Sequence, residues 1–209
     1  MDKEKNKNIS LTVIKRLPKY YRYLGELLDV DVSRISSKEL SERLNITASQ
    51  IRQDLNNFGS FGLQGYGYNV ELLYEEIGRI LGLNKKHNII IIGAGNIGRA
   101  LLNYSDFNNR GFKFIGVFDK SPELIGTKIN NITIQGVDEI EDFINSNNVD
   151  IAVLTVPKSS ANYITKILYK NEIRGIWNIS HVDLRTREFT KVEEVHLMDC
   201  LMTLSYKIN

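Results

Sequence analysis

The fold of the C-terminal part of this chain is decided by one stretch, His87-Asn88-Ile89-Ile90-Ile91-Ile92-Gly93-Ala94-Gly95-Asn96-Ile97-Gly98. The run of isoleucines predicts a strand that is buried on both faces, as in a parallel sheet. The strand leads directly into Gly-x-Gly-x-x-Gly and then into a helical pattern that continues to about Tyr104. This order of strand, glycine turn and helix is typical of a dinucleotide-binding domain.

Each glycine of this turn has an expected task. Gly93 permits the tight turn, Gly95 lets a pyrophosphate approach the backbone, and Gly98 lets helix and strand pack closely. The pyrophosphate would lie on the free N–H groups at the start of the helix. We therefore expect the nucleotide to be held by the whole turn, namely by Gly93, Ala94, Gly95, Asn96, Ile97 and Gly98.

An acid follows the second strand, Phe112 to Phe118. This acid, Asp119, would accept hydrogen bonds from ribose hydroxyls and would repel the extra phosphate of NADP, so the sequence predicts NAD(H). The adjacent Lys120 falls in the same site. Thr155, Val156 and Pro157 end a later strand at the carboxyl edge of the sheet, where ligands bind in such folds. Tyr104, at the end of the first helix, completes the expected nucleotide site.

Around this core, β-branched runs alternate with helical patterns, which predicts a parallel α/β sheet. Further strands are expected at Ile132–Ile134, Asp150–Val156, Gly175–Asn178 and Glu194–Leu197. Helices are expected at Val137–Asn147, Ser159–Asn171 and Met198–Tyr206. The predicted α/β, Rossmann-like domain occupies residues 85–209.

Residues 1–84 show helical periodicity instead. A first helix is expected from about Ser10 to Leu28. Ser36 begins a second helix through a capping box, and Thr47 caps a third one that ends near Asn57. Two short helices joined by a tight turn indicate a helix-turn-helix. The glycine and aromatic residues of Phe58–Tyr68 then predict a hairpin, so this domain is expected to be a winged helix; the helix Val70–Leu83 connects it to the next domain.

The third helix carries side chains that suit DNA recognition. Arginine reads guanine edges in the major groove, and glutamine or asparagine reads adenine edges. We expect base contacts from Ser49, Gln50, Arg52, Gln53 and Asn56. Phosphate contacts, which position the protein without reading sequence, are expected from Lys38, Arg43, Gly65 and Tyr66.

Composition limits the class of protein. The chain has 209 residues, 42% of them hydrophobic, which is enough for two packed cores, and a net charge of only +2. The lone Cys200 excludes an internal disulfide and favours a reducing compartment. Neither a membrane span nor a signal-peptide pattern is present, and the histidines and Cys200 lack metal-ligand spacing. We expect a cytoplasmic protein without a metal.

The sequence does not favour an enzyme. A dehydrogenase needs an acid or base near the nicotinamide and a place for its substrate. The Rossmann region is too short for a separate substrate domain, and it lacks a Tyr-x-x-x-Lys pair. His181 is the one candidate base, but a lone loop histidine is more often structural or solvated, so no catalytic residue is predicted.

These segments together resemble the Rex family of redox-sensing repressors, from about Ile9 to Tyr206. The resemblance is carried by Arg16–Leu24, Ser36-Ser37, Gln50–Leu55, Phe58–Tyr68, Ile80–Leu83, Gly93–Tyr104 and Gly175–Asn178. It implies a homodimer whose C-terminal helix swaps onto the partner. It also implies that NAD⁺ is compatible with DNA binding and that NADH releases the DNA. By position, Arg22, Tyr104 and Asp199 match the family's polar relay between the two kinds of domain.

Two departures from the family pattern stand out. Gln53 replaces the lysine of Arg-Lys-Asp-Leu in the recognition helix, which removes a cationic contact to DNA. Asn178-Ile179-Ser180-His181 replaces Asn-Phe-Ala-Pro, which alters the expected nicotinamide pocket.

The residues leave three alternatives open. The first is a small NAD-dependent oxidoreductase with a helical appendage. The second is a winged-helix regulator that senses another nucleotide such as coenzyme A. The third is a structural dimerisation module, against which the intact glycine turn and Asp119 argue.

Overall fold

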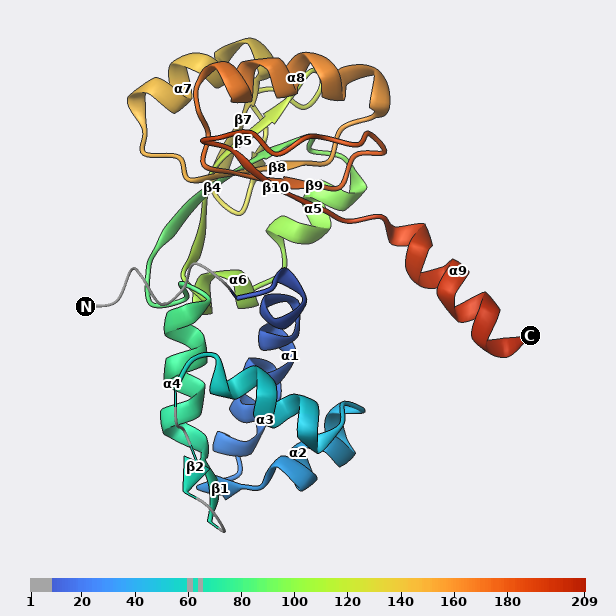
Figure 1. Ribbon diagram of the computed structural model, residues 1–209. Helices are drawn as coiled ribbons and strands as arrows, with labels where there is room; N and C mark the ends of the chain where they lie inside the picture. Colours follow the sequence, from blue (N-terminus) through green and yellow to red (C-terminus); the bar gives the residue numbers. More distant parts are fainter. Residues whose placement is uncertain (1–8, 60–61, 64–65) are drawn as a thin grey trace. The chain divides into compact units, whose positions relative to one another are not determined.

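The computed structural model describes residues 9–59, 62–63 and 66–209. By the proximity of Cα atoms the chain divides into two compact units, one ending at Asn84 and the other beginning at Lys85. Figure 1 labels the elements of both units.

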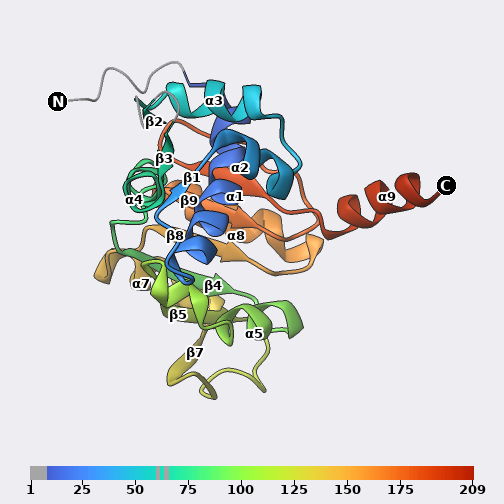
Figure 2. The same cartoon turned by 90° about the horizontal axis from the view of Figure 1, so that it is seen from below.

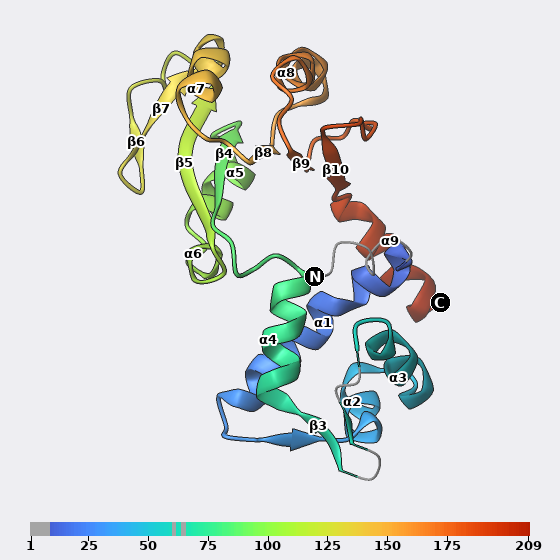
Figure 3. The same ribbon diagram turned by 60° about the vertical axis from the view of Figure 1, so that its left-hand side comes forward.

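In the first unit, the first and last helices, α1 and α4, pack against each other (Figure 3). Its elements are α1 (Leu11–Leu28), β1 (Arg34–Ile35), α2 (Ser37–Leu44), α3 (Ala48–Asn56), β2 (Gly62–Leu63), β3 (Gly67–Asn69) and α4 (Val70–Ile80). Tyr21 of α1 and Tyr74 of α4 stack with ring centroids 4.2 Å apart. The hairpin β2–β3 follows the helix pair α2–α3 and pairs with β1, which precedes that pair, in a small antiparallel sheet of order β1-β3-β2. This arrangement confirms the predicted winged helix.

The second unit is a twisted sheet with helices on both faces (Figure 1). Its strands are β4 (His87–Ile92), β5 (Phe112–Asp119), β6 (Lys128–Ile129), β7 (Ile132–Gly136), β8 (Ile151–Leu154), β9 (Gly175–Asn178) and β10 (Lys191–Glu194). Its helices are α5 (Asn96–Leu102), α6 (Asp106–Asn109), the short 3-10 helix η2 (Val137–Glu139), α7 (Ile140–Ser146), α8 (Lys158–Lys170) and α9 (Leu197–Ile208). The strand order is β10-β9-β8-β4-β5-β7-β6, parallel except for the β6–β7 pair, which confirms the predicted Rossmann-like fold.

The run of isoleucines in β4 serves both faces of this sheet. Ile90 and Ile92 pack with buried residues of α7 and α8, whereas Ile89 and Ile91 pack with Leu102 of α5. All four side chains are buried, as expected for the central strand of a parallel sheet covered by helices on both sides.

The end of the sheet differs from the prediction. The last strand was expected at Glu194–Leu197, but β10 covers Lys191–Glu194, and the next helix already begins at Leu197. The strand is set by its partner, because Lys191 pairs with Gly175 and Glu194 with Asn178 along β9. The sequence also did not predict β1, β6 or the short helix α6.

The final helix, α9, has an unusual environment. Every residue of α9 is exposed, including apolar side chains such as Leu201 and Met202, at 58% and 60%. Figure 2 shows α9 standing clear of the sheet that precedes it. Among the described residues, no helix is both long and apolar enough to cross a membrane.

Candidate nucleotide and DNA sites

The glycine turn has the backbone geometry that the sequence predicted. Gly93 has φ +107°, in the left-handed region that favours glycine. A Cβ on Gly98 would lie 2.0 Å from the carbonyl oxygen of Gly93, so only a glycine permits this approach of α5 to the turn. A Cβ on Gly95 would meet nothing within 4 Å. The turn therefore packs tightly at Gly98 and leaves open space at Gly95, where a ligand can approach.

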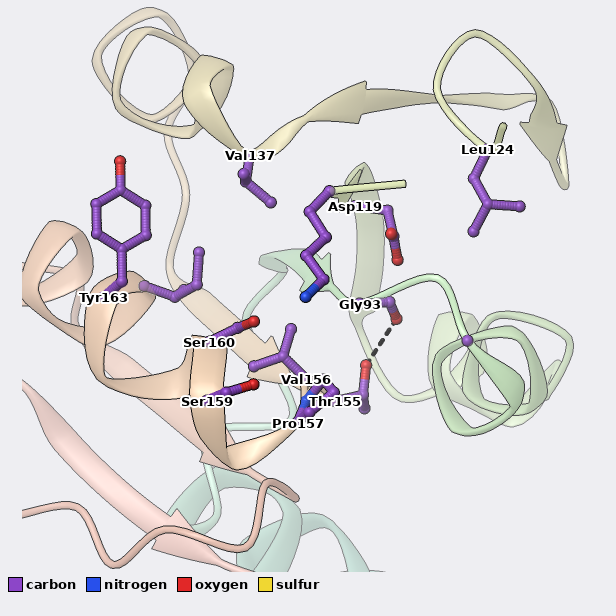
Figure 4. A pocket seen from close by; sticks show the side chains of 13 residues that line it. Gly93, Asp119, Leu124, Val137, Thr155, Val156, Pro157, Ser159, Ser160 and Tyr163 are labelled. Atoms are coloured by element: carbon purple, nitrogen blue, oxygen red, sulfur yellow. Dashed lines mark hydrogen bonds between the residues drawn. The ribbon is translucent and has the colours of Figure 1, made fainter. Parts of the chain in front are cut away.

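Two side chains brace the turn from neighbouring strands. The N–H of Ala94 donates to Oδ2 of Asp119 at 2.7 Å, and the N–H of Ser121 donates to Oδ1 at 2.8 Å. The hydroxyl of Thr155 donates to the carbonyl oxygen of Gly93 at 2.7 Å (Figure 4). Asp119 thus holds the turn as well as facing the pocket, a role that its place in the sequence did not indicate.

A cavity of about 530 Å³ opens at this turn, within the range of small-molecule sites (Figure 4). The predicted nucleotide residues that line it are Gly93, Gly95, Asp119, Lys120, Thr155, Val156 and Pro157. The sequence missed the other lining residues, which are Leu124, Val137, Ser159, Ser160, Tyr163 and Ile164. The lining is therefore largely apolar, with a carboxylate and an ammonium group on one side.

The other predicted nucleotide residues lie outside this lining. Ala94 and Gly98 are buried behind the turn, whereas Asn96 and Ile97 are exposed in the first turn of α5. Tyr104 is 61% exposed and lies edge-on to Phe107 at 5.5 Å between ring centroids. Phe107 in turn lies edge-on to Trp177, so Tyr104 belongs to an aromatic cluster rather than to the cavity.

Both helices of the predicted helix-turn-helix begin at the capping residues that the sequence indicated. Ser36 and Glu39 form the capping box of α2, and the Thr47 hydroxyl accepts from the N–H of Gln50 to cap α3. Because side chains three and four residues apart share a helix face, the exposed side chains at the predicted positions form one polar face. These are Ser49, Arg52, Gln53 and Asn56.

The remaining predicted DNA contacts have mixed environments. Lys38 is exposed, and Tyr66 is 71% exposed. Arg43 lies over the ring of Tyr23, 5.6 Å from its centroid, and 3.9 Å from a carboxylate oxygen of Glu26. Gly65 lies outside the described residues.

Comparisons with known proteins agree on both units. A family model for the N-terminus of DNA-binding proteins matches residues 8–56, and one described as a CoA binding domain matches residues 84–182. Redox-sensing transcriptional repressors Rex of Clostridium novyi and Clostridium botulinum are 54% and 56% identical over 206 residues, 99% of this chain and 98% of each relative.

The chain belongs to the Rex family. Solved Rex structures support this assignment across both units. RSP in complex with β-NAD⁺ and operator DNA is 52% identical, with a TM-score of 0.92 and coverage of 98% of this chain and 94% of that chain. RSP in complex with β-NADH is 50% identical, with a TM-score of 0.89 and coverage of 96% and 94%. The relatives are named as transcriptional repressors rather than as enzymes, which agrees with the prediction.

In this Rex family member, a buried charge network ties the recognition helix to α1. Asp54 of α3 is fully buried, and its two carboxylate oxygens accept from Nη2 and Nε of Arg16 at 2.6 Å each. The Tyr20 hydroxyl donates to Asp54 at 2.6 Å, and the Gln50 amide donates to it at 2.8 Å. The sequence missed this network because its members are far apart along the chain. It also places Gln50, a predicted base contact, in a half-buried position.

The network shifts the pKa values of two of its members, Asp54 and Tyr20. Burial acts to raise the pKa of Asp54, but hydrogen bonds from Arg16, Tyr20 and Gln50 outweigh it and hold that pKa below its usual range. Burial and the bond to Asp54 raise the pKa of the Tyr20 hydroxyl far above its usual range. Asp54 is therefore ionised and Tyr20 neutral at physiological pH, which suits a carboxylate acceptor with a hydroxyl donor.

The three residues that match the Rex relay are all exposed. Arg22 lies on α1 of the first unit, Tyr104 follows α5, and Asp199 lies in the first turn of α9. His181, the one candidate base, is also exposed, in the loop after β9.

Proposed function

We propose that this chain is a homodimeric repressor that binds operator DNA through residues 1–84 and releases it when NADH occupies residues 85–209. Transcription would then follow the ratio of NADH to NAD⁺ in the cytoplasm. The observation that carries this proposal is the union, in one chain of the Rex family, of an open glycine turn at Gly95 with an exposed polar face on α3.

The nucleotide would enter along the turn and the cavity. The pyrophosphate would lie against Gly95, because that position leaves room for the backbone to be approached. The ribose hydroxyls would donate to Asp119, whose carboxylate has lone pairs beyond the two that bind Ala94 and Ser121. Leu124 would contribute to an apolar wall for the adenine. The same carboxylate would disfavour the additional phosphate of NADP(H).

The dimer would use α9. Seven large apolar side chains of α9 are exposed, and exposed groups of apolar residues mark protein contacts. They are Leu197, Met198, Leu201, Met202, Leu204, Tyr206 and Ile208. We propose that α9 docks on a second copy of this chain, as the resemblance to the Rex family implies. Docking would then bring Asp199 to the partner subunit, where it would lie close to the other two relay positions, Arg22 and Tyr104.

We expect Arg52→Ala to weaken operator binding by about 1–3 kcal/mol and to relax specificity at one operator position. Arg52 donates to the Ser37 hydroxyl at 2.9 Å in this structure, so the guanidinium is held at the start of α2. The measurement is anisotropy titration against a panel of singly substituted operators. Lys38→Ala is the matched control, because loss of a phosphate contact weakens all operators alike. A uniform loss with Arg52→Ala would instead make Arg52 a phosphate contact.

Loss of the relay should uncouple NADH binding from DNA release. Asp199→Ala or Arg22→Ala should leave NADH affinity within about threefold and abolish most of the NADH-induced release of DNA, because a ligand shifts only an equilibrium whose states it binds differently. A full switch from 1:99 to 99:1 takes about 5.5 kcal/mol of differential binding. Calorimetry measures the NADH affinity and anisotropy measures the release of DNA, so the two effects are tested separately. Wild-type release by both variants would exclude the relay.

The decisive experiment is an anisotropy titration of a labelled near-palindromic operator with NADH, at fixed NAD⁺ and salt. Release by NADH, but not by NADPH or coenzyme A, supports the proposal. The coenzyme A control matters because the family model that matches residues 84–182 is described as a CoA binding domain. Release by coenzyme A alone would favour the regulator of another nucleotide. NADH turnover without DNA binding would favour the oxidoreductase.

A further inference from the structure

Three potential metal ligands meet where the chain leaves the sheet and enters α9. Asp183 lies in the loop after β9, Glu194 ends β10, and His196 immediately precedes α9. Their ligand atoms all lie within 4.8 Å of one another. Nε2 of His196 is 3.3 Å from Oε2 of Glu194 and 3.6 Å from Oδ1 of Asp183. We propose that these three side chains bind a divalent transition-metal ion of the Zn²⁺ class.

The spacing of the three atoms suits such an ion. Nitrogen and oxygen ligands lie about 2.0–2.2 Å from Zn²⁺, so two of them at a tetrahedral angle lie about 3.4 Å apart. The distances from His196 to both carboxylates are close to this value. One imidazole and two carboxylates are ligand types that Zn²⁺ accepts, and three protein ligands leave a fourth position for water. The set holds one histidine and no cysteine, and Asp183 comes from a separate loop, so the spacing of histidines and cysteine did not indicate the site.

Neighbouring groups orient two of the ligands. Oε1 of Glu194 accepts from the N–H of Leu184 at 2.5 Å, which leaves Oε2 directed toward His196. Asn178 is 1% exposed and donates to the carbonyl oxygen of Val182 at 2.6 Å. This bond fixes the loop just before Asp183. Hydrogen bonds that orient metal ligands in this way raise metal affinity.

The ion would join the loop after β9 to the short connection between β10 and α9, where Glu194 and His196 lie two residues apart. It would fix the loop after β9, the end of β10 and the residue before α9 to one point, and thereby fix where α9 begins. The site does not depend on the proposed repressor function, and its test needs neither DNA nor NADH.

The test is calorimetric titration of the full-length protein with Zn²⁺, in a Cys200→Ser background because Cys200 is exposed and thiolates bind zinc. We expect one Zn²⁺ per chain. Asp183→Asn and His196→Gln should each weaken binding at least about tenfold. The Asp183 side chain is 92% exposed, so its replacement leaves the fold intact. His181→Gln, a histidine on the same loop, is the matched control and should bind as the parent does.

A second readout identifies the ligands directly. Co²⁺ in place of Zn²⁺ should give the visible absorption of a four-coordinate site, and His196→Gln should remove it. The proposal is overturned if the Cys200→Ser protein binds no Zn²⁺, or if Asp183→Asn and His196→Gln bind it as tightly as their parent.

Discussion

Asp54→Asn should lower the free energy of unfolding of the first unit by about 3 kcal/mol and abolish most operator binding. The substitution keeps the shape of the side chain but removes the charge that faces Arg16, and breaking a buried pair by removing one partner costs about 3–5 kcal/mol. DNA binding should fail because α3 loses its attachment to α1. Urea unfolding followed by circular dichroism, together with operator anisotropy, measures both effects.

Asp106→Asn is the matched control for Asp54→Asn. Asp106 accepts from Arg110 at 2.7 Å, but both side chains are more than one-third exposed, and such surface pairs contribute about 1 kcal/mol or less. Equal stability and equal operator affinity of Asp54→Asn and the parent would show that the network does not position α3.

The same network predicts a pH dependence. The folded-state pKa of Asp54 is lowered, so its contribution is fully present above the unfolded pKa of about 3.9 and is lost as the pH falls toward the folded value. Acid should therefore destabilise the first unit below about pH 4. Asp54→Asn should lack this component, so the stability difference between parent and variant should shrink as the pH falls.

Gly98→Ala should abolish NADH binding and destabilise the second unit, whereas Gly95→Ala should abolish binding alone. A Cβ at position 98 would lie 2.0 Å from a backbone oxygen of Gly93, so the turn has to move, at a cost of about 1–3 kcal/mol. A Cβ at position 95 meets nothing in the protein but occupies the space proposed for the pyrophosphate. Its effect on stability should stay within about 1 kcal/mol.

Thermal unfolding and calorimetric NADH titration of the two glycine variants separate packing from binding. Each variant serves as the control for the other, because both add one methyl group within the same turn. Tight NADH binding by Gly95→Ala would show that the pyrophosphate does not lie at this position.

The sequence predicted the central elements well where a local pattern decides them. The isoleucines of β4 and the glycine spacing specify a strand and a turn within one stretch, and the capping residues Ser36 and Thr47 mark the starts of α2 and α3. The β10 strand was misplaced because its position follows from pairing with β9, which no local pattern reveals.

Only one wall of the nucleotide cavity was predictable from the sequence. The wall formed by the glycine turn and Asp119 follows from a known spacing, but Ser160 and Tyr163 reach the cavity only because α8 packs beside it. No local pattern marks Asp54 as buried, because its partner Arg16 lies on another helix. Both misses depend on tertiary contacts between distant residues.

The two roles of Asp119 have a consequence for how the coenzyme preference of this protein can evolve. Its carboxylate carries the N–H of Ala94, and under the proposed function it also discriminates against the phosphorylated coenzyme. A mutation that removes this carboxylate to allow NADP(H) binding would also remove its hydrogen bond to the glycine turn. Binding of either coenzyme depends on that turn. A change of coenzyme preference at this position would therefore pass through an intermediate that binds both coenzymes poorly.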